Sequence, residues 1–465
     1  MAGYAAGSTG WIARVRRSIA RFARRTGLRP PLGTVQAAYK PATKPASGLT
    51  PSMMPRLSQS RPALPAPPST FVREYAVPLD RRAEPTHVIL RLSIPGFPEA
   101  MPQVVYGEHA ISAEGNMVIA LSPSLAAESR DLGRSWSTHR VAIELPPRGC
   151  FTTSLGTRLV CTHTAKTASG GALIYRFDAE WKQTSAPFAV ESPWHGSASI
   201  GESHGTIMFA EYPDNAAKYR DDAAPVLDAR VWRSRDDGVS WSVVKTVPPS
   251  LIRHLHTLAP EPGIAGRWWL SSGDRAEEVF VWRSDDDGDS WIDVTEKAPD
   301  VPLHRHFTQY ARAVQRMTDL VFHDGFMIWG ADDWLGYTEK NANDRPAAGS
   351  RVYRARTDGP WKVEELGFCG KPVRNIVDVG PAFLLTTEAK YLERGARPDV
   401  FLLFKDDLNK VHHIAQIDNY AKGGTGFTYS FASRAASGGT FFSHRGAYDA
   451  FRADARILKW ELTFT

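Results

Sequence analysis

Short apolar runs alternate with turn-forming residues along most of the chain. Runs of this kind occupy residues 87–95, 206–211, 268–274 and 326–333, and Gly, Asp or Pro interrupts them. Runs of this length that are rich in Val, Ile, Phe and Trp predict β-strands, and helical periodicity is nearly absent from about residue 86 onward. We therefore expect residues 86–465 to form an all-β domain, as a sandwich, a barrel or a propeller.

An internal repeat decides between these architectures. Three segments fit the pattern S-x-D-x-G-x-S-W, namely SRDLGRSW at 129–136, SRDDGVSW at 234–241 and SDDDGDSW at 284–291. Their starts lie 105 and 50 residues apart, so a degenerate copy is expected between the first two. Degenerate copies are present at 175–182 and 354–362. A unit of about 50 residues favours a β-propeller.

The motif resembles the Asp-box, or BNR repeat, of sialidase-like β-propellers and of glycosyl-hydrolase-like BNR proteins. The resemblance implies four-stranded antiparallel blades with the motif in the turn between the third and fourth strands. The Asp would accept hydrogen bonds from turn N–H groups, the Gly would permit a positive φ, and the Trp would pack between blades. A calcium loop does not fit residues 285–289, because Ser290 stands where that loop needs Gly.

Seven units can be placed around the motif. They start near Gln103, Phe151, Ala198, His254, Arg316, Arg374 and Phe427. The fourth shows all its strands, at 254–259, 267–272, 278–284 and 291–294. The seventh has no fourth strand of its own after residues 457–463, so we expect residues 87–95 to supply it and close the ring. Six blades, as in sialidases, are the alternative.

Chemistry is expected on the face opposite the motif turns. Second strands end there and first strands begin there, so their polar residues would meet at one funnel. The catalytic candidates are Glu211, Tyr212, His254, Asp274 and Asp332. The substrate-binding candidates are His163, His195, His256, Arg316, Arg374, Asn375 and Glu388.

These residue types favour a glycoside hydrolase that acts on an acidic glycan. Asp274 and Glu211 would serve as acid and base, and Arg316 and Arg374 would pair with a substrate carboxylate. The sialidase R-I-P motif is not reproduced, since its nearest equivalent is R-L-S-I-P at 91–95. The alternatives are a uronate-specific polysaccharide lyase using His254, Tyr212 and Arg316, and a non-catalytic propeller that binds glycan or protein.

No cofactor is expected and no metal ligand is assigned, although His254 and His256 would lie on one face of a strand and could hold a divalent cation. The three cysteines, Cys150, Cys161 and Cys369, form no CxxC pair and are expected to be buried thiols.

The basic charge is concentrated at the N-terminus. Residues 1–73 hold 12 Lys and Arg and no Asp or Glu, which leaves 44 basic against 50 acidic residues in the body. The net charge of +6 is therefore no sign of nucleic-acid binding. Residues 1–26 contain an amphipathic, Arg-rich segment at 11–26 that suits an anionic membrane surface or resembles an organellar transit peptide. Residues 27–85 read as a Pro-rich linker. Without an apolar secretory segment, a cytoplasmic or peripheral membrane location is expected.

Overall fold

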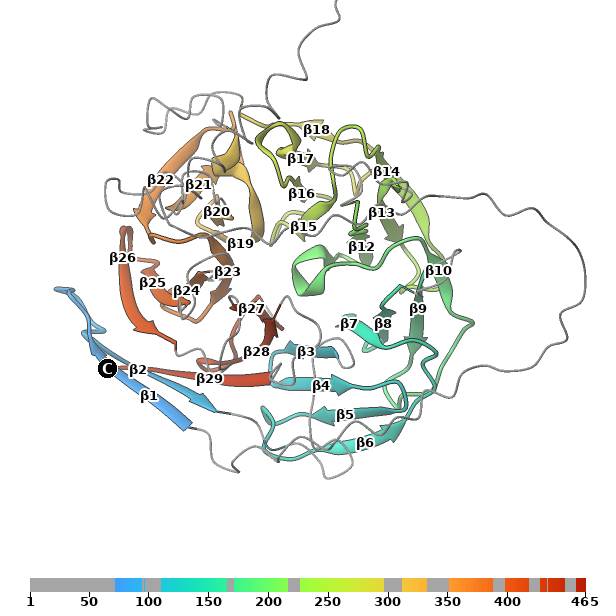
Figure 1. Cartoon of the computed structure of the whole chain (residues 1–465), viewed down its shortest axis with the longest axis horizontal. Helices are drawn as coiled ribbons and strands as arrows, with labels where there is room; N and C mark the ends of the chain where they lie inside the picture. The colour runs from blue at the N-terminus through green and yellow to red at the C-terminus, as the bar shows by residue number, and fades with distance from the viewer. Residues whose placement is uncertain are drawn as a thin grey trace, which may run out of the picture. The chain divides into compact units, whose positions relative to one another are not determined.

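The computed structural model describes residues 72–93, 96, 110–164, 171–215, 226–296, 312–332, 351–387, 398–417, 427–432, 434–447 and 457–465. The predicted amphipathic segment, most of the predicted linker and Glu388 lie outside these ranges. The strands of the described residues form seven antiparallel sheets, which are the blades of a β-propeller. Figure 1 shows them arranged in a ring, with β3, β7, β15, β19, β23 and β27 on the inside. Seven blades are thereby confirmed.

Six blades consist of four strands that are consecutive in the sequence. Blade 1 is β3 (Ala110–Glu114), β4 (Met117–Leu121), β5 (Leu125–Ser129) and β6 (Ser137–Arg140). Blade 2 is β7 (Pro147–Thr152), β8 (Arg158–Thr162), β9 (Ala172–Phe177) and β10 (Phe188–Val190). Blade 3 is β11 (Ile200–Ser203), β12 (Thr206–Ala210), β13 (Ala229–Ser234) and β14 (Ser242–Val247), preceded by the 3₁₀ turn η1 (Gly196–Ser199).

Blades 4 to 6 repeat this arrangement. Blade 4 is β15 (Leu255–Pro260), β16 (Trp268–Ser272), β17 (Phe280–Ser284) and β18 (Ile292–Asp293), with η3 (Ala276–Glu278) between β16 and β17. Blade 5 is β19 (Met317–His323), β20 (Phe326–Ala331), β21 (Arg351–Arg356) and β22 (Val363–Phe368), preceded by η5 (Ala313–Gln315). Blade 6 is β23 (Val373–Asp378), β24 (Ala382–Thr387), β25 (Asp399–Phe404) and β26 (Asp407–Gln416).

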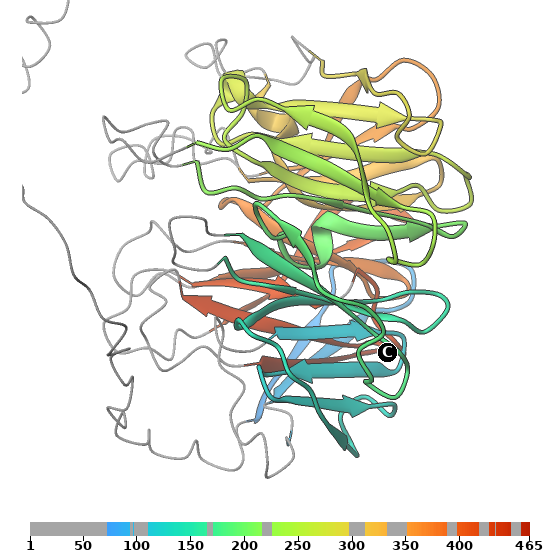
Figure 2. The same ribbon diagram turned by 90° about the vertical axis from the view of Figure 1, so that its right-hand side faces the viewer.

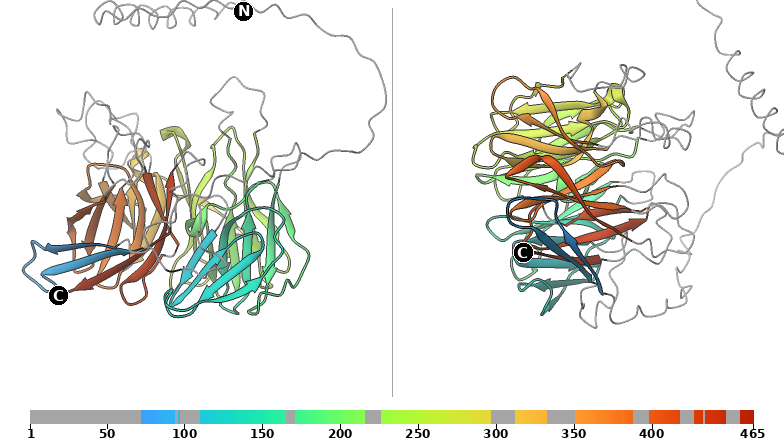
Figure 3. Two further views of the ribbon diagram at one scale, coloured as in Figure 1. Left: turned by 60° about the horizontal axis from the view of Figure 1, so that its bottom comes forward. Right: turned by 90° about the vertical axis from the view of Figure 1, so that its left-hand side faces the viewer.

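Blade 7 closes the ring with strands from both ends of the described chain. Its order is β27 (Phe427–Phe431), β28 (Thr440–Ala447), β29 (Ile457–Phe464), β2 (His87–Ser93) and β1 (Val72–Pro78). Strand β2 pairs antiparallel with β29, placing Leu90 opposite Leu462 and Leu92 opposite Trp460. The predicted ring closure by residues 87–95 is confirmed, and Figure 3 shows β1 and β2, in blue, beside the red strands of blade 7.

Strand β1 was not predicted. Residues 72–78 fall in the segment read as linker, yet every residue of β1 pairs with β2. Its side chains are mostly exposed, so it lacks the alternation of apolar and polar residues that marks a half-buried strand. Backbone pairing with β2 holds it, and Tyr75 and Val77 pack against the cluster between blades 6 and 7.

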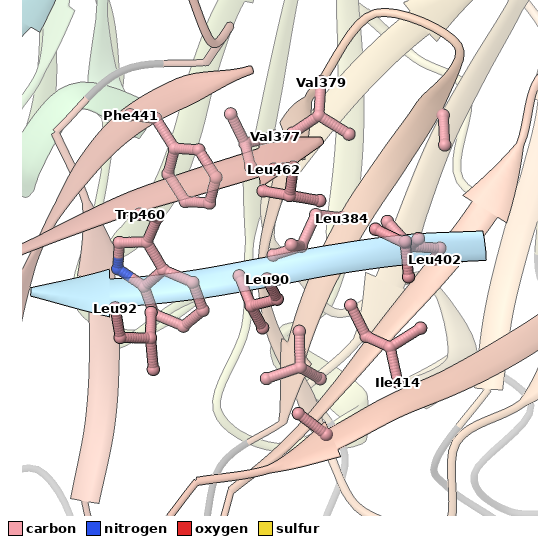
Figure 4. Close-up of a cluster of buried hydrophobic side chains, with 14 of the residues drawn as sticks. Leu90, Leu92, Val377, Val379, Leu384, Leu402, Ile414, Phe441, Trp460 and Leu462 are labelled. Atoms are coloured by element: carbon pink, nitrogen blue, oxygen red, sulfur yellow. The ribbon is translucent and has the colours of Figure 1, made fainter. Parts of the chain in front are cut away.

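The hydrophobic core is divided into clusters that lie between neighbouring blades. Each of the seven clusters takes its residues from two adjacent blades. Figure 4 shows the cluster between blades 6 and 7, where Leu90, Leu92 and Trp460 lie near Leu384 and Leu402. The three cysteines are buried free thiols in the clusters, as predicted.

The repeated motif forms the turn between the third and fourth strands in blades 1, 3 and 4. In blade 3, Asp236 accepts hydrogen bonds from the Ser240 N–H at 2.9 Å and the Ser240 hydroxyl at 2.6 Å. Gly238 has a φ of +82°, which an L-residue adopts only with strain. Trp241 is half-buried against the cluster between blades 2 and 3. The predicted geometry of the motif is therefore present, and its role is structural.

One arginine joins blades across the ring. Arg434, from the turn between β27 and β28, donates through Nη2 to the carbonyls of Ala198 at 2.6 Å and Leu258 at 2.8 Å. These carbonyls belong to blades 3 and 4. Arg434 therefore crosses the axis and ties blade 7 to the opposite side of the ring.

Candidate functional site

Polar side chains gather at the end of the blades opposite the motif turns. In an antiparallel sheet, the beginning of the first strand and the end of the second lie at the same end. Asp274 and Asp332 follow β16 and β20, while His254 and Arg316 immediately precede β15 and β19. The long connections, such as that from Ala210 of β12 to Ala229 of β13, are at this end too. Figure 2 shows the blades edge-on, with the two ends of the strands on opposite faces.

Four aromatic rings form a row across blades 3 and 4. The ring of Tyr212 is stacked between those of His195 and His254, with centroid separations of 4.2 and 3.9 Å. The rings of His254 and His256 are 5.0 Å apart, since alternate residues of a strand point to the same side. His254 and His256 are buried, whereas His195 and Tyr212 are partly exposed. The row therefore has an accessible end at His195 and a buried end at His256.

Asp274 organises the buried end. His254 Nε2 is 3.4 Å from its Oδ2, and His256 Nε2 is 3.6 Å from its Oδ1. Arg253 donates to Oδ2 at 2.6 Å and Arg316 donates to Oδ1 at 3.1 Å. Burial alone would raise the pKa of Asp274, but its contacts with the two histidines outweigh burial and hold the pKa well below its usual range. Asp274 is therefore a carboxylate at neutral pH.

Asp332 lies fully buried between two arginines. Arg316 Nη2 is 3.2 Å from its Oδ2, and Arg374 Nη1 donates to the same oxygen at 2.8 Å. Burial would raise the pKa of Asp332, but the two guanidinium groups bring it below its usual value. Arg316 thus bridges Asp274 and Asp332, and both predicted substrate-binding arginines are engaged by carboxylates of the protein.

Arg148 is a site residue that the sequence analysis missed. Its Nε donates to the Trp194 carbonyl at 3.1 Å, its Nη2 is 3.2 Å from His195 Nδ1, and its guanidinium lies 5.8 Å from the centroid of the Tyr212 ring. No carboxylate of the described residues pairs with it. The first strand of blade 2 was predicted to begin near Phe151, whereas β7 begins at Pro147. The sequence feature that could have identified Arg148 is a basic residue at the start of a first strand, as at Arg316.

Arg148 also determines the tautomer and the charge of His195. Because a guanidinium only donates, Nδ1 of His195 accepts and Nε2 carries the ring proton. Burial and the charge of Arg148 lower the pKa of His195 well below its usual value. His195 is therefore a neutral hydrogen-bond donor next to Tyr212.

Glu211 does not join this cluster. It is adjacent in sequence to Tyr212, so its side chain projects to the other side of the backbone. It is fully buried, with the Ser192 N–H donating to Oε1 at 3.4 Å and with Arg230 nearby. Burial raises the pKa of Glu211 to about 7. Among the described residues Glu211 makes no hydrogen bond with Asp274, and their action as acid and base stays a prediction.

Two further predicted residues, Asn375 and His163, belong to the described part of the chain. Asn375 donates to the Thr386 hydroxyl at 3.3 Å within blade 6. His163 is partly exposed beyond β8, and burial together with Arg148 lowers its pKa to about 4. Glu388 lies outside the described residues. Most of the predicted residues at first-strand starts and second-strand ends therefore lie in the polar cluster, but not all of them do.

The arginines of the cluster are unequally paired with carboxylates among the described residues. Among the described residues it contains Arg148, Arg253, Arg316 and Arg374, which face Asp214, Asp274 and Asp332. The carboxylates bind the last three arginines, so the unopposed positive charge belongs to Arg148. A substrate carboxylate or sulfate would find its partner there.

One group in the described residues has the donor set of a metal site. His254, His256 and Asp274 each offer a ligand atom, and these atoms lie within 4.8 Å of one another.

The described residues include no helix long and apolar enough to cross a membrane.

Comparisons with known proteins identify no family for this chain. No protein-family profile matches the chain, and no curated protein matches it in sequence. Solved propellers resemble it in shape. The WD40 propeller domain of Doa1 has 11% identity and a TM-score of 0.43, with 78% of this chain and 93% of that chain covered.

Two further solved structures resemble it to a similar degree. YCF48 bound to D1 peptide has 10% identity and a TM-score of 0.46, with coverages of 83% and 99%. Virginiamycin B lyase from Staphylococcus aureus has 12% identity and a TM-score of 0.45, with coverages of 81% and 100%. None of these three similarities reaches a TM-score of 0.5.

Proposed function

We propose that the propeller binds an acidic glycan at this cluster and cleaves it by β-elimination next to a uronate carboxylate. The observation that carries the proposal is Arg148, a cation without an ion pair among the described residues, in contact with His195 and Tyr212 at the accessible end of the ring row. Elimination needs a cation at the substrate carboxylate and a base that removes the neighbouring proton, and Arg148 and Tyr212 would supply them.

In this reaction Arg148 pairs with the uronate carboxylate, whose negative charge grows as the neighbouring carbon loses its proton. Tyr212, in its phenolate form, accepts that proton through Oη. The bond between the ring carbon and the glycosidic oxygen then breaks as a carbon–carbon double bond forms. Tyr212 returns the proton to the leaving oxygen, so no oxidant or reductant is needed. His195 donates its Nε2–H to the substrate and holds the Tyr212 ring by stacking.

Hydrolysis by two carboxylates, which the Asp-box resemblance favours, has less support. A glycosidase needs one carboxyl group with a raised pKa and one ionised carboxylate flanking the same bond. Asp274 and Asp332 both have lowered pKa values and are bound to arginines. Glu211 has the raised pKa but makes its contacts away from the cluster.

The test is a screen of the full chain against uronate oligosaccharides. Elimination yields an unsaturated product that absorbs in the ultraviolet, whereas hydrolysis yields new reducing ends without that absorbance. Tyr212→Phe is expected to lower the rate by about 100-fold or more while leaving substrate binding intact. Arg148→Gln is expected to weaken binding. Arg235→Gln is the matched control, because Arg235 is exposed in a motif turn on the opposite face.

The outcomes separate the three functions. Ultraviolet-absorbing product that is lost in Tyr212→Phe and kept in Arg235→Gln supports elimination. Reducing ends without absorbance would overturn it in favour of hydrolysis. Glycan binding without any cleavage would overturn it in favour of a binding propeller.

A further inference from the structure

We infer that His254, His256 and Asp274 bind one divalent transition-metal ion. The three residues belong to blade 4 and are brought together by the start of β15 and the end of β16. The inference does not require the elimination proposed above, since it rests on the arrangement of these three side chains.

The nitrogen–oxygen distances within the group are compatible with a shared metal ion. The His254–Asp274 and His256–Asp274 contacts are 3.4 and 3.6 Å between nitrogen and oxygen. These separations are longer than a good N–H···O hydrogen bond, which spans roughly 2.7–3.2 Å. They match the edge of a tetrahedron with metal–ligand bonds of about 2.1 Å, an edge of roughly 3.4 Å. The two nitrogens approach different oxygens of Asp274, and the three ligand atoms lie within 4.8 Å of one another, which is close enough for a common ion.

The imidazole nitrogens also lack other partners. Both ring nitrogens of His254 and Nδ1 of His256 are buried without a hydrogen bond in the described structure. The two residues are 1% and 3% exposed, so solvent does not supply the missing bonds. Buried polar groups are nearly always bonded, and one left without a partner costs about 1–3 kcal/mol. An ion between Asp274 and the two Nε2 atoms would satisfy one of these three nitrogens, Nε2 of His254.

Asp274 can ligate a metal ion while it accepts hydrogen bonds from the arginines around it. Arg253 and Arg316 donate to its two oxygens, and each carboxylate oxygen has a second lone pair for an ion. Hydrogen bonds of this kind commonly fix the orientation of ligating carboxylates. Two imidazoles and one carboxylate favour Zn²⁺, Fe²⁺ or Co²⁺ over Mg²⁺ and Ca²⁺, which prefer oxygen ligands.

The experiment titrates the untagged full chain after metals have been removed with a chelator. Co²⁺ is the probe because its visible absorption reports nitrogen and oxygen ligation, and Zn²⁺ is titrated by calorimetry. We expect one equivalent of each to bind and Mg²⁺ not to bind. His256→Gln and Asp274→Asn should each lose the Co²⁺ absorption. His139→Gln, on the outermost strand of blade 1, is the matched control and should keep it.

Circular dichroism of the metal-free variants shows whether each is folded. X-ray absorption of the Zn²⁺-loaded wild-type chain tests the ligands without any substitution, and two imidazole nitrogens are expected. No binding by the wild-type chain overturns the inference, and so does binding that survives both substitutions in folded protein. Metal binding without glycan cleavage would overturn the proposed function and leave this inference standing.

Discussion

At the scale of single residues, adjacent positions in this chain serve different purposes. Glu211 and Tyr212 follow β12 together, and strand alternation turns them to opposite sides. Tyr212 joins the row of rings at the axis, while Glu211 is buried near Ser192. The sequence predicts both as site residues because both lie at the right end of the strand. Only the direction of each side chain separates them.

Glu211→Gln is expected to change how stability depends on pH. The folded-state pKa of about 7 lies above the ordinary 4.5, so the folded protein keeps a proton that the unfolded chain releases. Stability should therefore fall as pH rises from about 4.5 to 7, by up to about 3 kcal/mol. The variant should lack this loss and be more stable than wild type at pH 8. Urea unfolding at pH 4.5 and pH 8 measures the difference, and equal stabilities at pH 8 would contradict it.

Two glycines have nearly the same backbone conformation but different surroundings. Replacing each by Ala distinguishes the cost of backbone strain from the cost of a steric clash. Gly238 and Gly205 have φ values of +82° and +81°. A Cβ at Gly238 would lie 2.7 Å from Leu159 Cδ2, while one at Gly205 would meet nothing within 4 Å. Both Ala variants should lose about 1 kcal/mol from backbone strain. Gly238→Ala should lose more, as chemical unfolding would show, and equal losses would mean that Leu159 moves aside freely.

At the scale of elements, the motif turn is a self-contained unit joined to the neighbouring blade. Within the turn of blade 3, Asp236 accepts bonds from Ser234 and Ser240. Its neighbour Asp237 accepts from Arg176 Nη2 of blade 2 at 2.6 Å. The turn therefore stabilises one blade and fastens it to the previous one, on the face away from the polar cluster.

Asp236→Ala should destabilise the fold without affecting the candidate site. Its bonds within the turn to Ser234 and Ser240 are lost, at a cost of about 2–3 kcal/mol. Asp178→Ala, in the degenerate copy of blade 2, is the comparison, because Asp178 accepts only from the Glu180 and Lys182 N–H groups. Asp178→Ala should therefore lower the free energy of unfolding by less than Asp236→Ala does. Thermal unfolding ranks the two, and a larger loss in Asp178→Ala would contradict the role given to the serines.

At the scale of the whole molecule, the ring is closed by residues far apart in sequence. Strand β2 covers β29, and Leu90 and Leu92 complete the cluster between blades 6 and 7. Arg434 adds a polar tie from blade 7 to Ala198 and Leu258. Strand β2 thereby covers the edge of β29, and β1 becomes the outermost strand of blade 7.

Deletions from the N-terminus should show a sharp boundary. A chain starting at residue 64 should fold, because it retains β1 and β2. A chain starting at residue 95 lacks both strands, so the β29 edge and the side chain of Trp460 lose their cover. It should aggregate or unfold at lower temperature. Size-exclusion chromatography and thermal unfolding compare the two, and equal behaviour would contradict closure by β2.

The N-terminal segment has its own prediction. Deletion of residues 1–30 should abolish binding to anionic liposomes, because it removes the arginines of the predicted amphipathic segment. The thermal unfolding of the propeller should stay unchanged. Liposome flotation with anionic and neutral vesicles is the measurement, and retained binding after the deletion would contradict the prediction.

The sequence alone determined what is periodic and local. The S-x-D-x-G-x-S-W turns repeat because the hydrogen bonds of Asp236 and its counterparts close within a few residues. Short apolar runs likewise identified the four strands of blade 4 and the closing strand β2 to within a few residues. The repeat and the strands together predicted the number of blades. They also predicted at which end of the blades the polar residues meet.

Only the tertiary structure decided which polar residues touch. Arg148 and His195 belong to neighbouring blades, as do Arg316 and Asp274. Their contacts depend on the angle between sheets and on where each first strand begins, which no local pattern encodes. Burial then set the charge states, because the low dielectric of the interior shifts a pKa by an amount that depends on every neighbour. The burial of Glu211 and the lack of a carboxylate at Arg148 among the described residues are consequences of that packing.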